Sequence, residues 1–449
     1  MVAAPMSTTR AITRHSADMW IAKFANRALG GLARDFSWAL TSNVIYYGCQ
    51  WSLMIVLAKI GTPADLGAYA LGLAVTVPVL FFASFQQRNL VAADVRDEYT
   101  FSEYITFRVA SMTGALLIVG IIAVLTQHSL SNIVIIMLIG LAQSFEYVSE
   151  TYFGLLQKHD RLDRVSLSLM LKGPLCLISL WLVMWLTQNV LVAALGLVLA
   201  RGTVLIFFDI PSAHSSCGYH RLKWNMRTQR KLFVTALPLG VIIGLGGLNL
   251  NIPRYFIEYF LTRRELGIFS ALASFIGAGN LVMAALASCM IVKLAKAWVT
   301  QDRRTCRSLF FRFVAVSAIV GSGGVLLAVV CGSTLLALLF RPEYAHSTGV
   351  LARIMAAGAI GYVVCAQGYT LTAARKLLVQ IPPLAASGAV TSLCCWALVP
   401  RRGLVGAAEA WILGAFFLAI CNAVLLAYIR EGHPVHWNAT TLSPVMEKK

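Results

Sequence analysis

Long apolar runs, separated by short polar segments, dominate this chain. If a run of about 20 apolar residues makes one membrane crossing, the pattern predicts twelve spans, at residues 38–58, 66–86, 107–126, 132–156, 165–187, 190–208, 232–260, 266–292, 310–331, 350–371, 381–399 and 404–429. A further apolar run at 332–340 is too short to cross a bilayer, and we expect it at the membrane surface. No uninterrupted apolar stretch precedes residue 38, so the first span is expected to stay in the membrane as an anchor.

Composition and charge give the class and the orientation. Of the 449 residues, 58% are hydrophobic and only 12% are charged, which places the chain outside the soluble globular class. With twelve spans, both termini and every second loop lie on one side, and that side holds 27 of the 37 Lys and Arg residues. Cytoplasmic loops collect such residues, so both termini are expected on the cytoplasmic side of the membrane. The net charge of +18 then reflects topology and predicts no nucleic-acid partner.

The loops and motifs exclude several kinds of chemistry. The loops are too short to fold as separate domains, no phosphate-binding Gly-x-x-x-x-Gly-Lys motif occurs, and the ten cysteines and eight histidines show no metal-ligand spacing. We therefore expect no catalytic residue, no metal and no cofactor. The predicted layout is an amphipathic cytoplasmic segment that lies on the membrane lipids (1–37), a six-helix bundle (38–208), a cytoplasmic linker (209–231), a second six-helix bundle (232–429) and a cytoplasmic tail (430–449).

An internal repeat supports the two bundles. Shifting the sequence by 200 positions aligns ADLGAYALGLA at 64–74 with RELGIFSALAS at 264–274. In both copies an acid precedes Leu-Gly, and an aromatic and a small residue follow. Each copy lies between the first and second spans of its half. The sequence therefore predicts an all-α polytopic membrane protein with about twelve transmembrane helices in two related bundles, a layout known among secondary transporters.

The same region carries a family resemblance. NIPRYFIEYFLTRRELGIFSAL, at residues 251–272, resembles the seventh-helix signature of the Wzx-type O-antigen and exopolysaccharide flippases of the multidrug/oligosaccharidyl-lipid/polysaccharide (MOP) superfamily, and the segments at 57–99 and 403–420 resemble its first two spans and its last. The resemblance implies alternating access and a lipid-diphosphate-linked oligosaccharide as cargo. It also implies work alongside a polysaccharide polymerase and export machinery.

Four cations inside the predicted spans suit such a cargo. A charge at the bilayer centre costs at least about 2.5 kcal/mol, and Arg binds phosphate oxygens with two parallel hydrogen bonds. Arg201 and Arg254 are the strongest candidates, with Asn251 and Tyr255 beside Arg254. Lys172 precedes a Gly-Pro pair that would open the helix. Arg353 lies near the outer end of its span, where extension to the membrane surface is an equal alternative.

The acidic residues in the spans leave several alternatives open. Glu146 and Glu150 share one helix face and are candidates to bind a coupling ion, to hold an embedded arginine or to line the cytoplasmic mouth. Glu258, four residues after Arg254, would neutralise it in an i,i+4 pair. Four glycines between 240 and 247, with prolines at 238 and 253, predict either an interrupted helix or close helix packing.

The predicted function is an inner-membrane flippase for a lipid-linked oligosaccharide that performs no covalent step. The alternatives are a multidrug or small-solute antiporter of the same fold, which would need an acidic cavity, and a membrane polysaccharide polymerase or ligase, which would usually present a large outer loop. Because the first half has Met54 at the position that matches Arg254, we expect the second half to hold the cargo.

Overall fold

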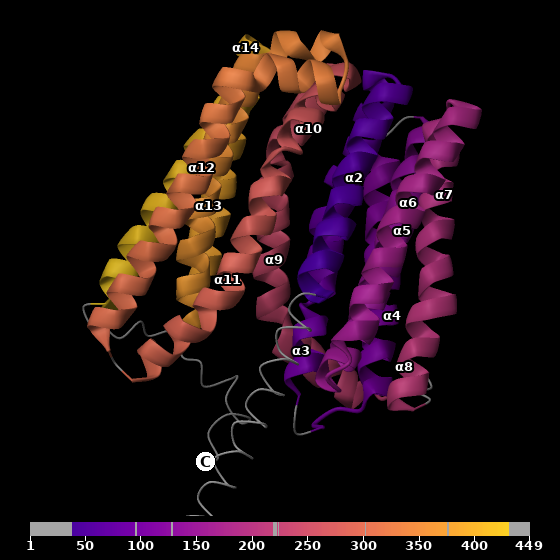
Figure 1. Ribbon diagram of the computed structural model, residues 1–449, viewed down its shortest axis with the longest axis vertical. Helices are drawn as coiled ribbons and strands as arrows, with labels where there is room; N and C mark the ends of the chain where they lie inside the picture. The colour runs from indigo at the N-terminus through magenta and orange to yellow at the C-terminus, as the bar shows by residue number, and fades with distance from the viewer. Residues whose placement is uncertain are drawn as a thin grey trace, which may run out of the picture.

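The described part of the chain is helical. The computed structural model describes residues 38–94, 97–126, 129–218, 222, 224–300, 302–374 and 377–430, and over these it contains no strand (Figure 1). The first described helix covers 38–60. It is followed by α2 (Pro63–Ser84), α3 (Gln87–Ala93), α4 (Phe101–Thr126), α5 (Leu130–Lys158), α6 (Leu162–Thr187), α7 (Val190–Val204), the π-helix η1 (Leu205–Asp209), α8 (Ile210–Cys217), α9 (Met226–Phe260), α10 (Arg263–Ala273), α11 (Ile276–Val299), α12 (Arg303–Leu339), the 3-10 helix η2 (Pro342–Ser347), α13 (Thr348–Ala373), the 3-10 helix η3 (Leu378–Gln380) and α14 (Ile381–Arg430).

The predicted number of spans is confirmed. Ten helical stretches of the described chain are long and apolar enough to cross a membrane. The last of them, Leu378–Ile429, has 52 residues and is interrupted at Gly403, whose φ of 56° and ψ of −133° favour glycine because it has no Cβ. Counting this stretch as two crossings and adding the helix over 38–60 gives about twelve. The predicted N-terminal segment 1–37 and the tail beyond residue 430 lie outside the described residues.

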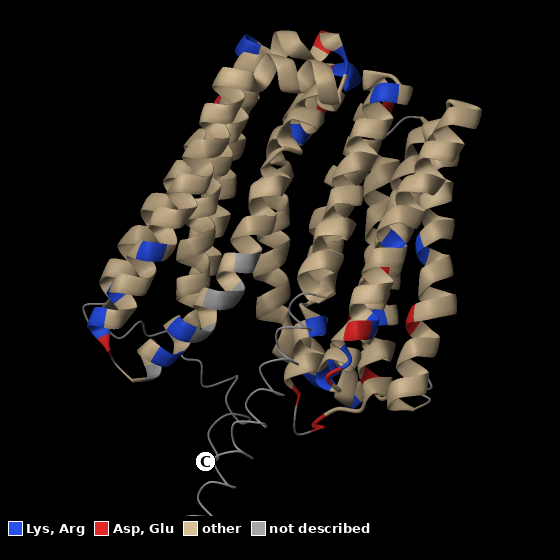
Figure 2. Ribbon diagram, viewed as in Figure 1, with Lys and Arg blue, Asp and Glu red and all other residues tan. Residues whose placement is uncertain are grey.

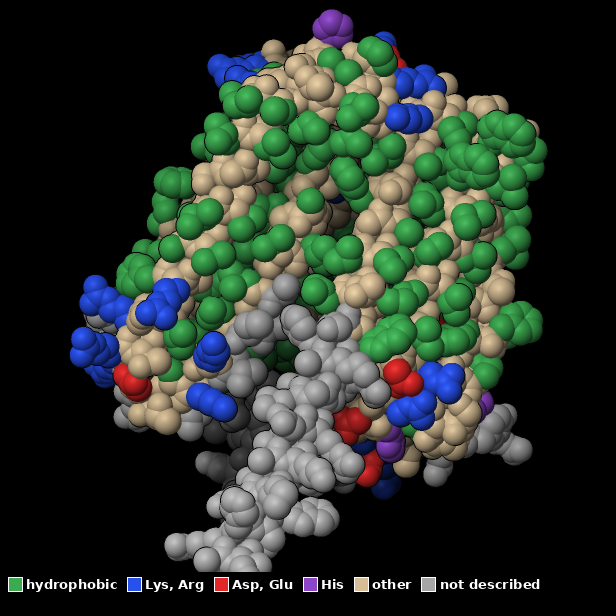
Figure 3. All heavy atoms as spheres, in the orientation of Figure 1, with side chains coloured by type: hydrophobic (Ala, Val, Ile, Leu, Met, Phe, Trp, Pro, Cys, Tyr) green, Lys and Arg blue, Asp and Glu red, His purple; other side chains and the backbone are tan. Residues whose placement is uncertain are grey.

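Two helical bundles stand side by side (Figure 1). In the first, α5 packs against α2, α4 and α7; in the second, α13 packs against α11, α12 and α14. The bundles meet where α2 of the first half packs along α9 and α10 of the second. On the face seen in Figure 3 the surface is hollowed between them.

The repeated corner brings the two halves together. Thr62 and Thr262 each cap a helix through a capping box, with Asp65 and Glu265 as the respective acids. The helices that follow then cross at two glycines. A Cβ on Gly67 would lie 2.0 Å from the carbonyl oxygen of Arg263, and one on Gly267 would lie 1.9 Å from that of Pro63. Because Gly67 contacts residue 263 as Gly267 contacts residue 63, the two corners are related by the twofold pseudosymmetry that the shift of 200 residues predicts.

Two expectations about the chain path are wrong. The run 332–340 does not lie apart at the membrane surface but continues α12 as far as Leu339, because Gly332 lets Thr348 and Leu351 of α13 pack against this turn. The segment 209–231 is not a linker throughout. Its first nine residues are helical, and α9 already begins at Met226, where the Asn225 side chain accepts a hydrogen bond from the backbone N–H of Arg227.

The glycines of α9 serve close packing. The helix runs without interruption through Pro238 and Pro253, so the interrupted-helix alternative is not observed. Gly240 and Gly244 lie against Phe82 of α2, and Gly247 lies against Phe81. Small residues allow two membrane helices to approach closely, and here they join the two halves along α2 and α9.

Candidate functional site

Buried charge lies in the first bundle. Among the described residues, five charged side chains are at least nine-tenths buried, and all belong to that bundle: Arg108, Glu146, Lys172, Arg201 and Asp209. Figure 2 shows acidic and basic positions together partway along the helices of this bundle. Four of the five, all except Arg108, form one connected group, which we call the charge cluster.

Lys172 is the centre of the charge cluster. Its Nζ lies 3.5 Å from Oε1 of Glu146 on α5 and 3.4 Å from Oδ2 of Asp209. The side chain has no exposed surface, and its ammonium group lies 5.0 Å from the ring centroid of Phe153. Two carboxylates therefore neutralise this amine, and it is closed to a cargo in this structure.

Asp209 ends a short π-helix. Its Oδ1 accepts a hydrogen bond from the hydroxyl of Ser168 on α6. A π-turn adds one residue to a helical turn and rotates the side chains that follow, and such turns are frequent at functional sites. The π-helix Leu205–Asp209 thereby accompanies a carboxylate turned into the bundle, on a residue that the sequence prediction had assigned to the linker.

Arg201 completes the charge cluster. Its Nε lies 3.8 Å from Oε2 of Glu146. The other nitrogens donate to the side-chain oxygens of Gln143, at 2.8 Å, and of Gln50, at 3.4 Å. Of the alternatives for Glu146, the structure therefore shows it holding an embedded arginine. With two acids and two cations, the cluster is neutral overall.

Arg108 lies deeper in the first bundle than its sequence position suggested. Its Nε donates to the Thr151 hydroxyl at 2.8 Å, and the Tyr147 ring centroid lies 6.0 Å from its guanidinium carbon. Its two terminal nitrogens are buried and have no hydrogen-bond partner among the described residues. Glu150 is half-buried, and its carboxylate interacts electrostatically with Arg88 and Arg108.

Arg254 differs from the two cations of the charge cluster because no described carboxylate lies within ion-pair distance of it. Its Nη1 donates to Oδ1 of Asn251 at 2.6 Å and to the Leu250 carbonyl at 3.3 Å, and its Nε donates to the Ser270 hydroxyl at 3.3 Å. The neighbouring Tyr255 hydroxyl donates to the Ala74 carbonyl of α2. The half-buried guanidinium therefore lies where α9 and α10 meet the first bundle.

Two further ion pairs decide between alternatives. Glu258 does not close the i,i+4 pair with Arg254; its Oε1 instead lies 3.3 Å from Nε of Arg263. Arg353 lies 3.6 Å from Glu409, with 43% of its side chain exposed, which agrees with the alternative that places it at the membrane surface. The predicted candidates thus separate into the charge cluster, Glu150 one turn further along α5, the Arg254 site, and the ion pairs of Glu258 and Arg353.

Asp209 and Arg108 were missed, although the sequence carries a signal for each. Thr100 and Glu103 form the T-x-x-E pattern that starts a helix. Their side chains are joined at 2.9 Å, so α4 begins at Phe101 and encloses Arg108. Asp209 follows two phenylalanines and precedes an isoleucine, so apolar residues flank it on both sides. A span boundary placed just before it hid that context.

Comparison with known proteins gives the fold and a relative. No family model matches the chain. The chain is 27% identical over 325 residues to the capsular polysaccharide biosynthesis protein CapF of Staphylococcus aureus, which covers 71% of this chain and 80% of CapF. The structure of this chain superposes on that of an inward-facing multidrug resistance MATE family transporter of the MOP superfamily. The TM-score is 0.67 and the identity 13%, over 87% of this chain and 94% of the transporter. The fold is that of the MOP superfamily. The lipid II flippase MurJ, in an inward closed conformation, also matches, with a TM-score of 0.66 and 9% identity over 86% and 87% of the two chains.

These likenesses confirm the resemblance to the Wzx-type polysaccharide flippases of the MOP superfamily. The predicted fold class, an all-α membrane protein with two bundles, is confirmed with it. The chain thus has the fold of these MOP transporters and a relative named for capsular polysaccharide biosynthesis. The residues that meet its cargo are the subject of the proposal that follows.

Proposed function

We propose that this MOP-fold protein is a flippase that moves a lipid-diphosphate-linked oligosaccharide from the cytoplasmic to the outer leaflet of the inner membrane by alternating access, with no covalent step. One observation carries the proposal: Arg254 is a cation between the two bundles without a described carboxylate within ion-pair distance. A diphosphate head group would supply the missing negative charge. The CapF relative is named for capsular polysaccharide biosynthesis, which supports this cargo class.

The surroundings of Arg254 suit a phosphate contact. Asn251 is buried, donates its own amide to the Gly247 carbonyl and accepts from Arg254, so the guanidinium is held in place before a ligand arrives. Holding a donor in its productive geometry reduces the ordering cost of binding. Tyr255 adds a hydroxyl one residue away, already directed at α2.

The charge cluster supports an ion-coupled cycle. Its two carboxylates, Glu146 and Asp209, share the amine of Lys172. Protonating either acid would leave Lys172 with a single partner and change the balance of charge between α5, α6 and η1. Such a change is a local event that can bias a bundle between two arrangements.

The orientation follows from the cations in the loops. Figure 2 shows Lys and Arg gathered mainly at the end of both bundles that carries α3, α8 and the α11–α12 connection. We assign this end to the cytoplasm by the positive-inside rule, and with it both termini.

The multidrug antiporter is the second candidate, because a MATE transporter shares the fold. A cationic drug would need an acid that lacks a cationic partner. In the charge cluster both acids are already matched by Lys172 and Arg201, which favours the anionic cargo.

The test is Arg254→Ala, measured as surface polysaccharide in a strain whose own copy of the gene is deleted. Loss of a charged hydrogen-bonding pair is expected to lower export about 10- to 100-fold, with normal amounts of inserted protein. Export by Arg254→Lys should fall between that of the wild type and that of Arg254→Ala, because a lysine keeps the charge but loses the paired donors. Arg353→Ala is the matched control and should export normally, since Glu409 already pairs with that arginine. Normal export by Arg254→Ala would overturn the diphosphate contact.

A further inference from the structure

The two halves carry opposite charge at matching hairpins. In the first half, residues 87–107 contain two cations and four acids. Shifted by 200 positions, residues 287–307 contain five cations and one acid. Both hairpins belong to the same end of the molecule (Figure 1). The positive-inside rule acts on an entire side of the membrane, so it does not account for a difference between two hairpins on that side.

The cations of the second hairpin form no ion pair within the described structure, and Arg307 lies over the ring of Phe311. Lys293 and Lys296 on α11 and Arg303, Arg304 and Arg307 on α12 form no ion pair with any described carboxylate. The one acid, Asp302, caps α12 by accepting from the backbone N–H of Thr305 at 3.0 Å.

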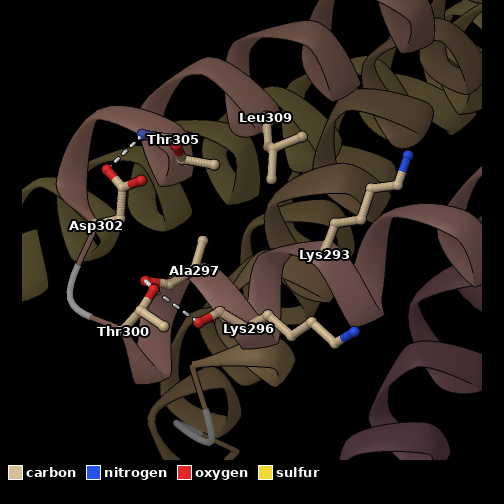
Figure 4. A pocket seen from close by; sticks show the side chains of 7 residues that line it. All are labelled: Lys293, Lys296, Ala297, Thr300, Asp302, Thr305 and Leu309. Carbon is tan, nitrogen blue, oxygen red and sulfur yellow. Dashed lines mark hydrogen bonds between the residues drawn. The ribbon is translucent and has the colours of Figure 1, made fainter. Parts of the chain in front are cut away.

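Lys293 and Lys296 border an open pocket. The pocket measures about 360 Å³ and is also lined by Thr300 and Thr305. Figure 4 shows both ammonium groups pointing to the same side, away from Asp302. In Figure 3, Lys and Arg side chains gather at the lower end of the second bundle, several of them at its outer left edge and others nearer the middle of the view. Two ammonium groups on one side of the helix supply charged donors that suit the oxygens of a phosphate ester.

Ion pairs between the two hairpins are less well supported than binding of an external phosphate. Three of the four acids of the first hairpin are engaged locally. Asp94 accepts from the backbone of Glu98 and Tyr99, Asp97 lies 2.6 Å from Lys158, and Glu103 caps Thr100. Among the described residues, the cations of the second hairpin thus lack a free set of opposing carboxylates, which favours an anionic ligand as their partner.

We propose that the α11–α12 hairpin is a capture site for the diphosphate of the lipid-linked cargo, which binds Lys293 and Lys296 before the head group reaches Arg254. The inference rests on the proposed function and adds a second, outer site to it. Clefts lined by one sign of charge raise the local concentration of an oppositely charged ligand and speed its entry.

The test uses purified protein in nanodiscs of uncharged lipid and geranylgeranyl diphosphate as the probe. The double variant Lys293→Gln, Lys296→Gln is expected to weaken binding by about tenfold or more, on the scale of one basic residue's contribution at an anionic surface. The matched control Arg401→Gln, Arg402→Gln removes two cations from the outer end of the same bundle and should bind as the wild type does. The charge-preserving variant Lys293→Arg, Lys296→Arg should also keep binding.

Each other outcome overturns the capture site. Equal weakening in the control pair would mean that only net charge matters. Failure of inorganic diphosphate to compete with the probe, with competition by phosphatidylglycerol vesicles, would identify a surface for membrane lipid. Unchanged probe binding by the Lys293 and Lys296 variant, while Arg254→Ala still abolishes export, would remove the capture site and leave the proposed function standing. Normal export by Arg254→Ala would instead remove the proposed function.

Discussion

The two bundles share a fold and treat charge in opposite ways. The first encloses Lys172, Glu146, Arg201 and Asp209 in a neutral cluster with almost no exposed surface. The second leaves Arg254 half-buried at its border with the first bundle, held by an amide and a hydroxyl. A self-neutralised cluster serves the bundle that contains it, whereas a cation without an acid partner is ready for a ligand. The difference supports the proposal that the first half undergoes the internal change and the second half contacts the cargo.

The same division appears at the two matching hairpins, residues 87–107 and 287–307. The hairpin of the first half uses its acids as caps and in local pairs, while that of the second half leaves its cations without a described acid partner. In both places a cation of the second half has no ion-pair partner among the described carboxylates, which Arg108 of the first half also lacks. The expectation from Met54 and Arg254 that the second half holds the cargo thus stays a prediction, and these contacts support it.

The largest effect is expected from Lys172→Met. Removing the amine leaves two buried carboxylates without their shared partner, and breaking a buried pair in this way costs about 3 to 5 kcal/mol. The apparent Tm of the purified protein, measured by its tryptophan fluorescence, should fall strongly. Arg254→Met removes a half-buried cation that has no described acid partner, and should lower the apparent Tm little or not at all.

The control for this contrast is the double variant Lys172→Met, Asp209→Asn. It leaves Glu146 with Arg201 and turns Asp209 into a neutral amide, so most of the lost stability should return. If the double variant is as unstable as the single one, Lys172 acts through packing against Phe153 and the cluster is not held by charge.

A smaller effect is expected from Gly67→Ala and Gly267→Ala. Each added Cβ would lie about 2 Å from a carbonyl oxygen of the other half, so α2 and α10 must separate, at about 1 to 3 kcal/mol. Both variants should speed amide hydrogen exchange at 62–70 and at 262–270 together, because one crossing holds both corners. Gly246→Ala, where nothing lies within 4 Å of the added Cβ, is the control. Faster exchange in only one corner would contradict the twofold pseudosymmetry of the contact.

The sequence predicts what depends on continuous pattern. Apolar runs predicted about twelve spans, and the acid-Leu-Gly repeat predicted a matching corner in each of two related halves, since both signals are local and unbroken. Burial of Arg201 followed from its position inside a span. These features require no knowledge of which helices pack together.

What could not be predicted depends on how the chain bends between elements. Glu258 has Arg254 one turn before it, yet the non-helical φ and ψ at Leu261, −121° and −149°, turn the chain so that Arg263 reaches it. Asp209 is directed into the bundle by a π-turn, and the spacing of apolar residues in the sequence does not predict such a turn. In both cases a single bend decides which charge is neutralised.

The smallest effect is expected at the hairpin of the first half. The hydrogen bond and charge of Lys158 lower the pKa of Asp97 below its usual value of 3.8. A carboxyl whose pKa is lowered on folding adds stability above its unfolded pKa, and that stability is lost as the pH falls through the folded value. At about pH 6, Asp97→Asn should therefore exchange its amide hydrogens at 97–104 slightly faster than the wild type does.

At about pH 3 the two should become alike, after correction for the intrinsic rate, as Asp97 of the wild type takes up its proton. In the hairpin of the second half, Asp302 has a pKa lowered by its hydrogen bonds with Thr305 rather than by an ion pair. High salt should therefore weaken the difference in exchange rate between the wild type and Asp97→Asn. It should leave the corresponding difference between the wild type and Asp302→Asn largely unchanged, because salt screens exposed charge pairs more than short hydrogen bonds. Equal salt dependence at the two hairpins would break the contrast, since it would mean that the acids of the first half are held no differently from the one acid of the second.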